Sequence, residues 1–189
     1  TMTLNMGPQH PSTHGVLRLV LELDGETVLD ARPDIGYLHT GIEKTVEAKT
    51  YSQAITLTDR VDYLCPMMNN FCYCLAVERL LGLEIPPKAQ WIRVLLAELT
   101  RLNSHLVWLG THAIDIGAMS VFLYCFRERE EILRLFEMVS GQRMMTSYIR
   151  IGGLGPEPPP GFFDRARGFI RAFPEHVDEY ENLLTENPI

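Results

Sequence analysis

The first forty residues alternate between apolar and polar positions, which is the pattern of β-strands. Four leucines recur at every second position from Leu17 to Leu23, so one face of an extended segment would be apolar. The dipeptide Asp24-Gly25 separates this run from a second apolar run, and this arrangement favours a hairpin. With the short extended segment 3–6 in front, the pattern predicts a three-stranded antiparallel meander whose first connection, residues 7–15, lies at one tip.

From about Gly41 the spacing of apolar residues becomes helical. Three long helices are expected, and prolines and glycines mark most of their ends. The first is apolar nearly all round and should be buried; the second opens at a Pro-Pro pair and stops before Gly117; the third stops at Gly141. They are expected at Asp62 to Leu81, at Pro87 to about Asp115, and at Ala118 to Val139.

The segment 152–161 is rich in glycine and proline and should interrupt regular structure. Two amphipathic pieces are expected after it, separated by Pro174. The fold class is therefore α+β, an N-terminal antiparallel β meander followed by a mainly helical bundle. The expected division is a β region over 1–40, a helical core over 41–151, and a Pro/Gly-rich linker with amphipathic helices over 152–189.

Composition and charge exclude several classes of function. Hydrophobic residues make up 46% and charged residues 22%, as in a soluble globular protein. The net charge of −7 argues against nucleic-acid binding. No apolar run is long enough to span a membrane, and the first ten residues do not resemble a signal peptide, so a reducing compartment such as the cytoplasm is expected. The four cysteines have no CxxC spacing and are expected to be buried thiols without a disulfide or metal role.

Two histidines, His10 and His14, lie in the first connection of the meander. Their spacing of four suits a helical metal pair, but Pro11 and Gly15 oppose a helix there. A rigid polar loop that presents His14 suits proton transfer or hydrogen bonding to a ligand. The alternative is an ordinary capped hairpin loop with exposed histidines, and the sequence leaves both interpretations open.

A polar stripe on the long helix is the second candidate. Six residues follow spacings of three and four and share one face: Glu98, Arg101, His105, Trp108, His112 and Asp115. This stripe is either the solvated face of the helix or a buried face that conducts protons. The third candidate, Tyr63, lies where the first long helix should begin. Its hydroxyl could donate a hydrogen bond to a ligand carbonyl, or its ring could simply pack there.

Five segments of the chain carry a resemblance to a known family. They are NMGPQHPSTHGVLR, DIGYLHTGIEK, DRVDYL, ELTRLNSHLVWLGTHAIDIGA and GQRMMTSYIRIGG. With these segments the chain resembles the N-terminal half of the quinone-site subunit of respiratory complex I, the proton-pumping NADH:quinone oxidoreductase. The fold of that family is related to the large subunit of nickel–iron hydrogenases.

The resemblance implies a quinone pocket shared with a partner subunit. It assigns the headgroup ligands and immediate proton donors to His14 and Tyr63, and the acidic partner of the loop histidine to Asp115. His10 and Thr111 match neighbours of the same pocket. Quinone is then the substrate, no cofactor is bound covalently, and this chain holds no metal.

The resemblance also implies an iron–sulfur cluster on the partner subunit. Arg60 matches an arginine near that cluster. The family often has a histidine two residues after the arginine that is Arg143 here, and this chain has Met145 in its place. Further implied partners are the other peripheral-arm and membrane-arm subunits, with the protein peripheral on the cytoplasmic face of the cell membrane.

Two alternatives remain beside this interpretation. A nickel–iron hydrogenase-like large subunit would need two CxxC pairs, and this chain has Asp62 at the first position of the matching pair and keeps only Cys65. An inactive interaction or assembly fragment is the other alternative. Because the pocket is shared, the isolated chain should be inactive even if the resemblance holds.

Overall fold

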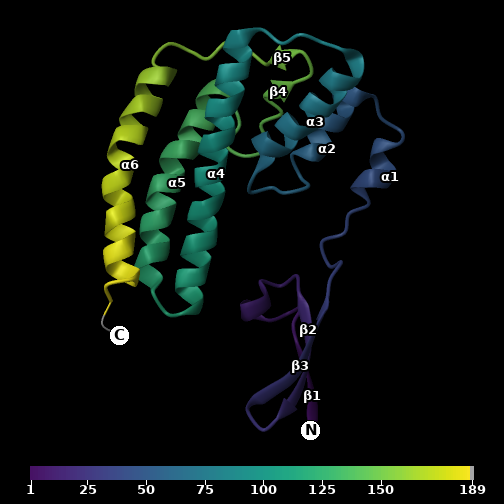
Figure 1. Cartoon of the computed structure of the whole chain (residues 1–189), viewed down its shortest axis with the longest axis vertical. Coiled ribbons are helices and arrows are strands. Elements are labelled where there is room, and N and C mark those ends of the chain that lie inside the picture. The colour runs from purple at the N-terminus through teal and green to yellow at the C-terminus, as the bar shows by residue number, and fades with distance from the viewer. Residues whose placement is uncertain (188–189) are drawn as a thin grey trace. The chain divides into compact units, whose positions relative to one another are not determined.

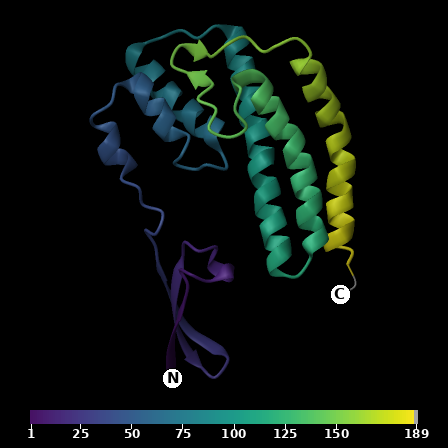
Figure 2. The same cartoon turned by 180° about the vertical axis from the view of Figure 1, so that it is seen from behind.

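The computed structural model describes residues 1–187. Contacts between Cα atoms divide the chain into two compact units, residues 1–45 and the residues from Val46 onward. Figure 1 shows the strands of the first unit in purple and the helices of the second in blue to yellow, and Figure 2 shows the reverse side. The expected division into three parts, with a boundary at 151/152, stays a prediction.

The first unit is a three-stranded antiparallel meander in the order β1-β2-β3, which confirms the sequence-based expectation. Leu21 of the central strand lies opposite Leu4 on one side and Ala31 on the other. The alternating leucines are half-buried, and the third strand is exposed along its whole length. The strands are β1 (Met2–Met6), β2 (Arg18–Asp24) and β3 (Thr27–Asp34), with a bulge between Glu22 and Leu23.

The second unit is helical, with one small hairpin. The α4, α5 and α6 helices lie side by side, and α2 and α3 pack near one end of α4 (Figure 1). Prolines begin α3 and α4, where a missing N–H costs nothing, and left-handed glycines end α3 and α5. The short helix α1 (Ile42–Val46) lies at the boundary of the two units. The elements after it are α2 (Tyr51–Thr58), α3 (Pro66–Leu81), α4 (Pro87–Asp115), α5 (Met119–Ser140), β4 (Ile149–Arg150), β5 (Gly153–Leu154) and α6 (Phe162–Leu184).

The closest helix packing is between α4 and α5. A Cβ atom on Gly110 would lie 3.2 Å from the Phe122 ring and 3.4 Å from Cβ of Cys125, so a side chain there would require the Phe122 ring or α5 to shift by a few tenths of an ångström. The expected ends of both helices are confirmed to within one residue. The core that they share with the other elements includes Met67, Leu96, Leu99, Ile132, Leu135, Phe136, Ile149 and Phe162.

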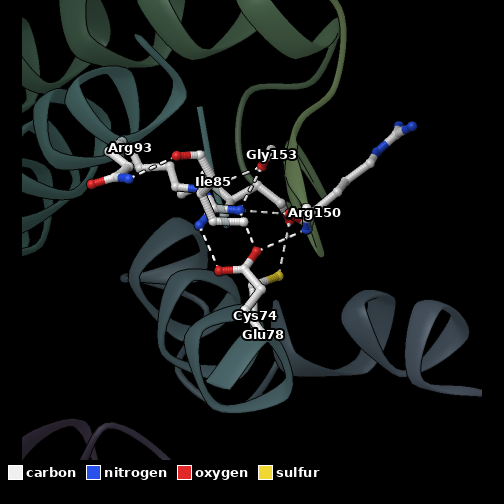
Figure 3. Close-up of polar contacts among 9 residues, drawn as sticks. Cys74, Glu78, Ile85, Arg93, Arg150 and Gly153 are labelled. Atoms are coloured by element: carbon white, nitrogen blue, oxygen red, sulfur yellow. Dashed lines mark hydrogen bonds and ion pairs between the residues drawn. The ribbon is translucent and has the colours of Figure 1, made fainter. Parts of the chain in front are cut away.

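A buried ion pair joins α3, α4 and the β4–β5 hairpin. Arg93 donates two hydrogen bonds to the carboxylate of Glu78, at 2.6 and 2.9 Å, and only 1% and 3% of the two side chains is exposed. The same guanidinium donates to the backbone carbonyls of Arg150 at 2.7 Å and Gly153 at 2.8 Å, while the Gly152 N–H donates to Glu78 at 2.8 Å. Figure 3 shows these bonds converging on the two side chains. Two helices and the hairpin are therefore fixed at one point.

The same contacts keep the Glu78 carboxylate charged. Burial disfavours the charge, but the hydrogen bonds from Arg93 and Gly152 and the positive charge of Arg93 outweigh it. Together they hold the pKa of Glu78 below its usual value. The stability that this carboxylate contributes is thus present above the usual carboxyl range and is lost as the pH falls through the lowered pKa.

The first long helix begins later than expected. It was predicted from Asp62, but α3 starts at Pro66, because Asp62 instead closes a turn by accepting from the Leu64 N–H at 3.0 Å. Nor is α3 buried all round. Leu75 is 40% exposed and Leu80 is 73% exposed, so only one face of this apolar helix is covered by the described part of the chain.

The expected break at Pro174 is also wrong. A single helix, α6, runs from Phe162 to Leu184 with Pro174 inside it. Pro174 is on the exposed side, whereas Ala166 and Tyr180 are buried. Packing against α5 therefore continues on the other side of the helix, and it offsets the one hydrogen bond that a proline removes.

We predict that Glu78→Gln lowers the free energy of unfolding of the chain by about 3–5 kcal/mol at pH 7, because it leaves the buried Arg93 charge unpaired. The loss should shrink as the pH falls below the usual carboxyl range, where the wild-type Glu78 also becomes neutral. Urea unfolding at several pH values measures both effects. Glu84→Gln, at an exposed position, is the matched control; an equal loss in both variants at pH 7 would contradict the prediction.

Candidate functional site

The loop 7–15 of the first unit is stiff. The Thr13 side chain is 3% exposed, and its hydroxyl lies 3.0 Å from the His10 carbonyl oxygen and 3.3 Å from that of Pro8. Gly7 has φ +84°, and a Cβ there would lie 2.1 Å from the Leu17 carbonyl oxygen, so no other residue fits. The two ends of the loop are thus held together by close backbone packing.

Both histidines of this loop are exposed, on either side of a short 3-10 turn over Pro11–Thr13. His10 Nδ1 accepts a hydrogen bond from the Ser12 N–H at 3.1 Å. His14 adopts a left-handed conformation with φ 54°, and its N–H donates to the Pro11 carbonyl at 3.1 Å. A non-glycine residue in this region is held there by its surroundings. The backbone therefore fixes the direction in which the His14 side chain leaves the loop.

Tyr63 lies on a turn between α2 and α3. The turn is fixed at its far end by Asp62, whose carbonyl oxygen accepts from the Cys65 N–H at 3.0 Å and from the Asn69 side chain at 2.9 Å. The Tyr63 side chain is 48% exposed. A phenol on a well-anchored turn can present its hydroxyl to a ligand at little cost in conformational entropy.

The start of this turn is fixed by Asp59, whose side chain is fully buried. Its carboxylate accepts hydrogen bonds from the Asn70 amide at 2.7 Å, from the Ser147 hydroxyl at 2.6 Å and from the Ser147 N–H at 3.2 Å. Thr58 donates to the Asn70 carbonyl oxygen at 2.7 Å. These four residues, Thr58, Asp59, Asn70 and Ser147, form what we call the Asp59 network.

The Asp59 network brings two of the expected site segments together. Arg60 follows Asp59 directly and donates to the Thr56 carbonyl. Met145 precedes Ser147 by two residues and is half-buried. In the second unit, the turn carrying Arg60 and Tyr63 is thus joined to the loop carrying Met145 by one carboxylate.

The polar stripe of α4 is exposed in the described structure, Trp108 by 57%. His112 Nδ1 lies 3.0 Å from the Trp108 carbonyl oxygen, and their rings are 5.3 Å apart. Thr111 is half-buried, and its hydroxyl donates to the Val107 carbonyl at 2.9 Å. Of the two interpretations of this stripe, the surface of the chain itself favours the exposed one.

Asp115 and Tyr63 are associated with different parts of α4. The Cys65 thiol, two residues after Tyr63, is hydrogen-bonded to Ser104 in the middle of the helix. Eleven residues separate Ser104 from Asp115, which is about 17 Å along the axis at ~1.5 Å per residue. His10 and His14 belong to the first unit and the other expected site residues to the second.

The expectation that all four cysteines are buried is wrong in part. Cys74 and Cys125 are buried, but Cys65 is half-buried and Cys72 is exposed; all four are free thiols. Cys72 and Cys74 lie two residues apart on α3, so they point to different faces, and only one face is packed. Within residues 1–187, no three His, Cys, Asp or Glu side chains lie close enough together to hold a metal ion.

Three residues near the candidate site were not identified from the sequence: Asp59, Asn70 and Ser147. Asp59 is inside the DRVDYL segment, next to Arg60, and its local sequence is that of a polar residue at the end of a helix. Its hydrogen bonds to Ser147 span 88 positions, and no periodicity reports a contact over that distance. The neighbours of Asp59, Thr58 and Arg60, are polar, so the local sequence gave no sign that this carboxylate is buried.

Two family profiles match parts of the chain. The profile of the respiratory-chain NADH dehydrogenase 49 kDa subunit matches residues 115–189, and that of nickel-dependent hydrogenases matches residues 40–123. The β meander followed by helices agrees with this relationship. The chain thus has the α+β fold of the class related to the hydrogenase large subunit, as expected.

Individual relatives cover the whole chain, and each is a D-type subunit of NADH-quinone oxidoreductase. The chain is 72% identical over 189 residues to the protein of Koribacter versatilis and 73% identical over 188 residues to that of Solibacter usitatus. The protein of Chloroflexus aurantiacus is 67% identical over 189 residues. All of this chain is covered in each comparison, but only 46–47% of each relative.

The chain therefore belongs to the family of D-type subunits of NADH-quinone oxidoreductase and corresponds to their N-terminal part, which confirms the resemblance seen in the five segments. It spans about half the length of these relatives. Among the helices of residues 1–187, none combines the length and apolar character needed to cross a membrane.

We predict that Cys72 is alkylated well before Cys74 and Cys125 at pH 8. Burial raises the pKa of each of the latter two thiols to about 11, and only the thiolate reacts. Mass spectrometry of the chain after brief treatment with iodoacetamide identifies the modified residue. Cys72→Ser should remove the fast phase; equal rates at Cys72 and Cys74 would show that the exposed face of α3 is covered in solution.

Proposed function

We propose that the protein to which this chain belongs forms the quinone-reduction pocket of a proton-translocating NADH:quinone oxidoreductase, together with a partner subunit that carries an iron–sulfur cluster. The observation that carries the proposal is Tyr63, a half-exposed phenol on an anchored turn inside one of the five matching segments. The stiff loop that presents His14 supports it.

In this mechanism His14 and Tyr63 are the two ligands of the quinone headgroup. Each side chain donates a hydrogen bond to one carbonyl oxygen, and this polarises the ring toward reduction. The cluster of the partner would supply the two electrons, and the uptake of two protons with them would convert quinone to quinol. Tyr63 and His14 supply these protons and are reprotonated from solvent.

Asp115 acts as the acidic partner of His14. A carboxylate beside an imidazole orients the ring and stabilises its protonated form. Loss of the two protons changes the charge around Asp115, and this change is the signal passed to the membrane-arm subunits. His10 and Thr111 complete the surroundings of the pocket.

Arg60 and Met145 lie on the side of the cluster. The Asp59 network joins the segments that carry them, so both residues act on the same partner. The protein would be peripheral, on the cytoplasmic face of the cell membrane, and in contact with the other subunits of the peripheral arm. The isolated chain is inactive in this proposal, because the pocket needs the partner.

The proposal predicts that Tyr63→Phe, in the full-length protein within the assembled complex, lowers NADH-to-quinone turnover by about a hundredfold, as expected for loss of a proton donor. NADH turnover with an artificial acceptor should be unchanged. Tyr73→Phe is the matched control, since the Tyr73 hydroxyl donates only to the Tyr51 carbonyl, at 3.0 Å. If Tyr63→Phe keeps its quinone turnover, Tyr63 is a packing residue and the assigned site must be withdrawn.

Met145 generates a second prediction. A thioether does not take up a proton, so the potential of the nearby cluster should depend only weakly on pH. Met145→His should introduce a clear pH dependence near neutrality, because imidazole titrates there, whereas Met145→Leu should not. Redox titration of the complex at several pH values, followed by electron paramagnetic resonance, measures the slope. A steep slope in the wild type would refute the role given to this position.

A further inference from the structure

Ser147 is the strained residue of the Asp59 network. Its φ is 43°. Among the described residues, Ser147 and His14 are the only ones that have a positive φ without being glycine. Such a conformation is strained for a residue with a side chain. Something in the surroundings must therefore hold Ser147 in place.

The Asp59 carboxylate makes most of the hydrogen bonds that do so, while the Ser147 carbonyl oxygen also accepts from Arg150 Nε at 3.3 Å. One of its oxygens, Oδ2, accepts from both the N–H and the hydroxyl of Ser147, at 3.2 and 2.6 Å. The other oxygen, Oδ1, accepts from Asn70 at 2.7 Å, and Thr58 fixes the Asn70 amide in turn. The carboxylate thus has no freedom to rotate without losing a hydrogen bond. It is also fully buried, so water cannot replace either partner.

Ser147 and Asn70 need an acceptor with two oxygens, which a carboxylate provides. Burial raises the pKa of Asp59 above its usual value, and the hydrogen bonds from Ser147 and Asn70 and the charge of Arg60 only partly offset it. An acid of this kind carries a desolvation cost that a serine or an alanine would avoid. Only a two-oxygen acceptor can receive the Ser147 N–H, the Ser147 hydroxyl and the Asn70 amide together.

The two segments joined in this way are those that carry Arg60 and Tyr63 on one side and Met145 on the other. Asp59 directly precedes Arg60, and Ser147 follows Met145 by two residues. A change in the backbone at either residue moves a side chain assigned to the quinone or to the cluster.

We propose that Asp59 is a positioning residue for quinone reduction, which holds the left-handed backbone of Ser147 and thereby sets the spacing between the Tyr63 turn and the Met145 loop. This inference rests on the proposed function of Tyr63. Asp59 itself touches neither quinone nor cluster. Its effect passes through the backbone at Ser147, so a residue that adopts positive φ without help should make Asp59 dispensable.

The test uses the full-length protein in the assembled complex. Asp59→Asn keeps the size of the side chain but replaces one acceptor oxygen with an N–H donor, so that the side chain can no longer accept from both Ser147 and Asn70. It should raise the KM for a short-chain quinone and lower quinone turnover by about ten- to a hundredfold, the range for a small misplacement of reacting groups. Turnover with an artificial acceptor should be unchanged. Asp164→Asn, on the exposed side of α6, is the matched control.

The second variant adds Ser147→Gly to Asp59→Asn. Glycine adopts φ near 43° freely, so the double variant should recover most of the quinone turnover. A purely stabilising role of Asp59 predicts the opposite, because the double variant loses one more hydrogen-bonding side chain. A role of the Asp59 charge in proton transfer also predicts no recovery. Absence of recovery would therefore overturn the proposal.

A third variant keeps the proposal testable if Asp59→Asn fails to assemble. Ser147→Val leaves Asp59 intact but disfavours positive φ, because a β-branched residue is strained there. It should reproduce the rise in KM; an unchanged KM would overturn the proposal. Tyr63→Phe is measured in parallel. Full quinone turnover in Tyr63→Phe would refute the proposed function. If Tyr63→Phe loses quinone turnover but Asp59→Asn keeps it, only the role of Asp59 is refuted.

Discussion

The buried pair of Glu78 and Arg93 is the constraint on which the second unit depends. Two opposite charges removed from water are costly unless every donor and acceptor is satisfied, and here the guanidinium bonds both the carboxylate and two carbonyls of the β4–β5 hairpin. The hairpin has only two residues in each strand, too few to be stable alone. Its position therefore follows from the ion pair, and the loop that leads from α5 to Ser147 ends at that fixed hairpin.

This arrangement explains why the candidate site can be built from turns. Tyr63, Arg60 and Met145 all lie outside helices and strands, where backbone conformation is least determined by local propensity. Two buried carboxylates compensate for this. Glu78 holds the hairpin after the Met145 loop, and Asp59 holds the loop itself against the turn. The Arg60 and Tyr63 side chains are exposed, while the two carboxylates that fix the neighbouring backbone are buried.

Sequence patterns predicted the elements that depend on local rules. The alternating leucines indicated the meander, and Pro87, Gly117 and Gly141 marked the ends of α4 and α5. The start of α3 was predicted too early. The Asp62 side chain caps a turn there instead of joining the helix, and the spacing of apolar residues does not show this. Pro174 was overinterpreted, since contacts with α5 outweighed the loss of one hydrogen bond. Tyr63 and His14 were candidates from their places in the pattern, and the resemblance assigned them to the quinone headgroup. Asp59 and Ser147 were not identified, because their contact spans 88 residues.

The close approach of α4 and α5 at Gly110 has a consequence for the order of folding. These helices are joined by a short connection, so the loop that must close before they meet is small and its entropic cost is low. The bonds from Arg93 to Gly153 and from Gly152 to Glu78 close loops of 60 and 74 residues. Rapid folding favours contacts between neighbours in sequence. Contact between α4 and α5 is thus favoured early in folding, and the hairpin is joined to the buried charges only once an apolar framework exists to receive it.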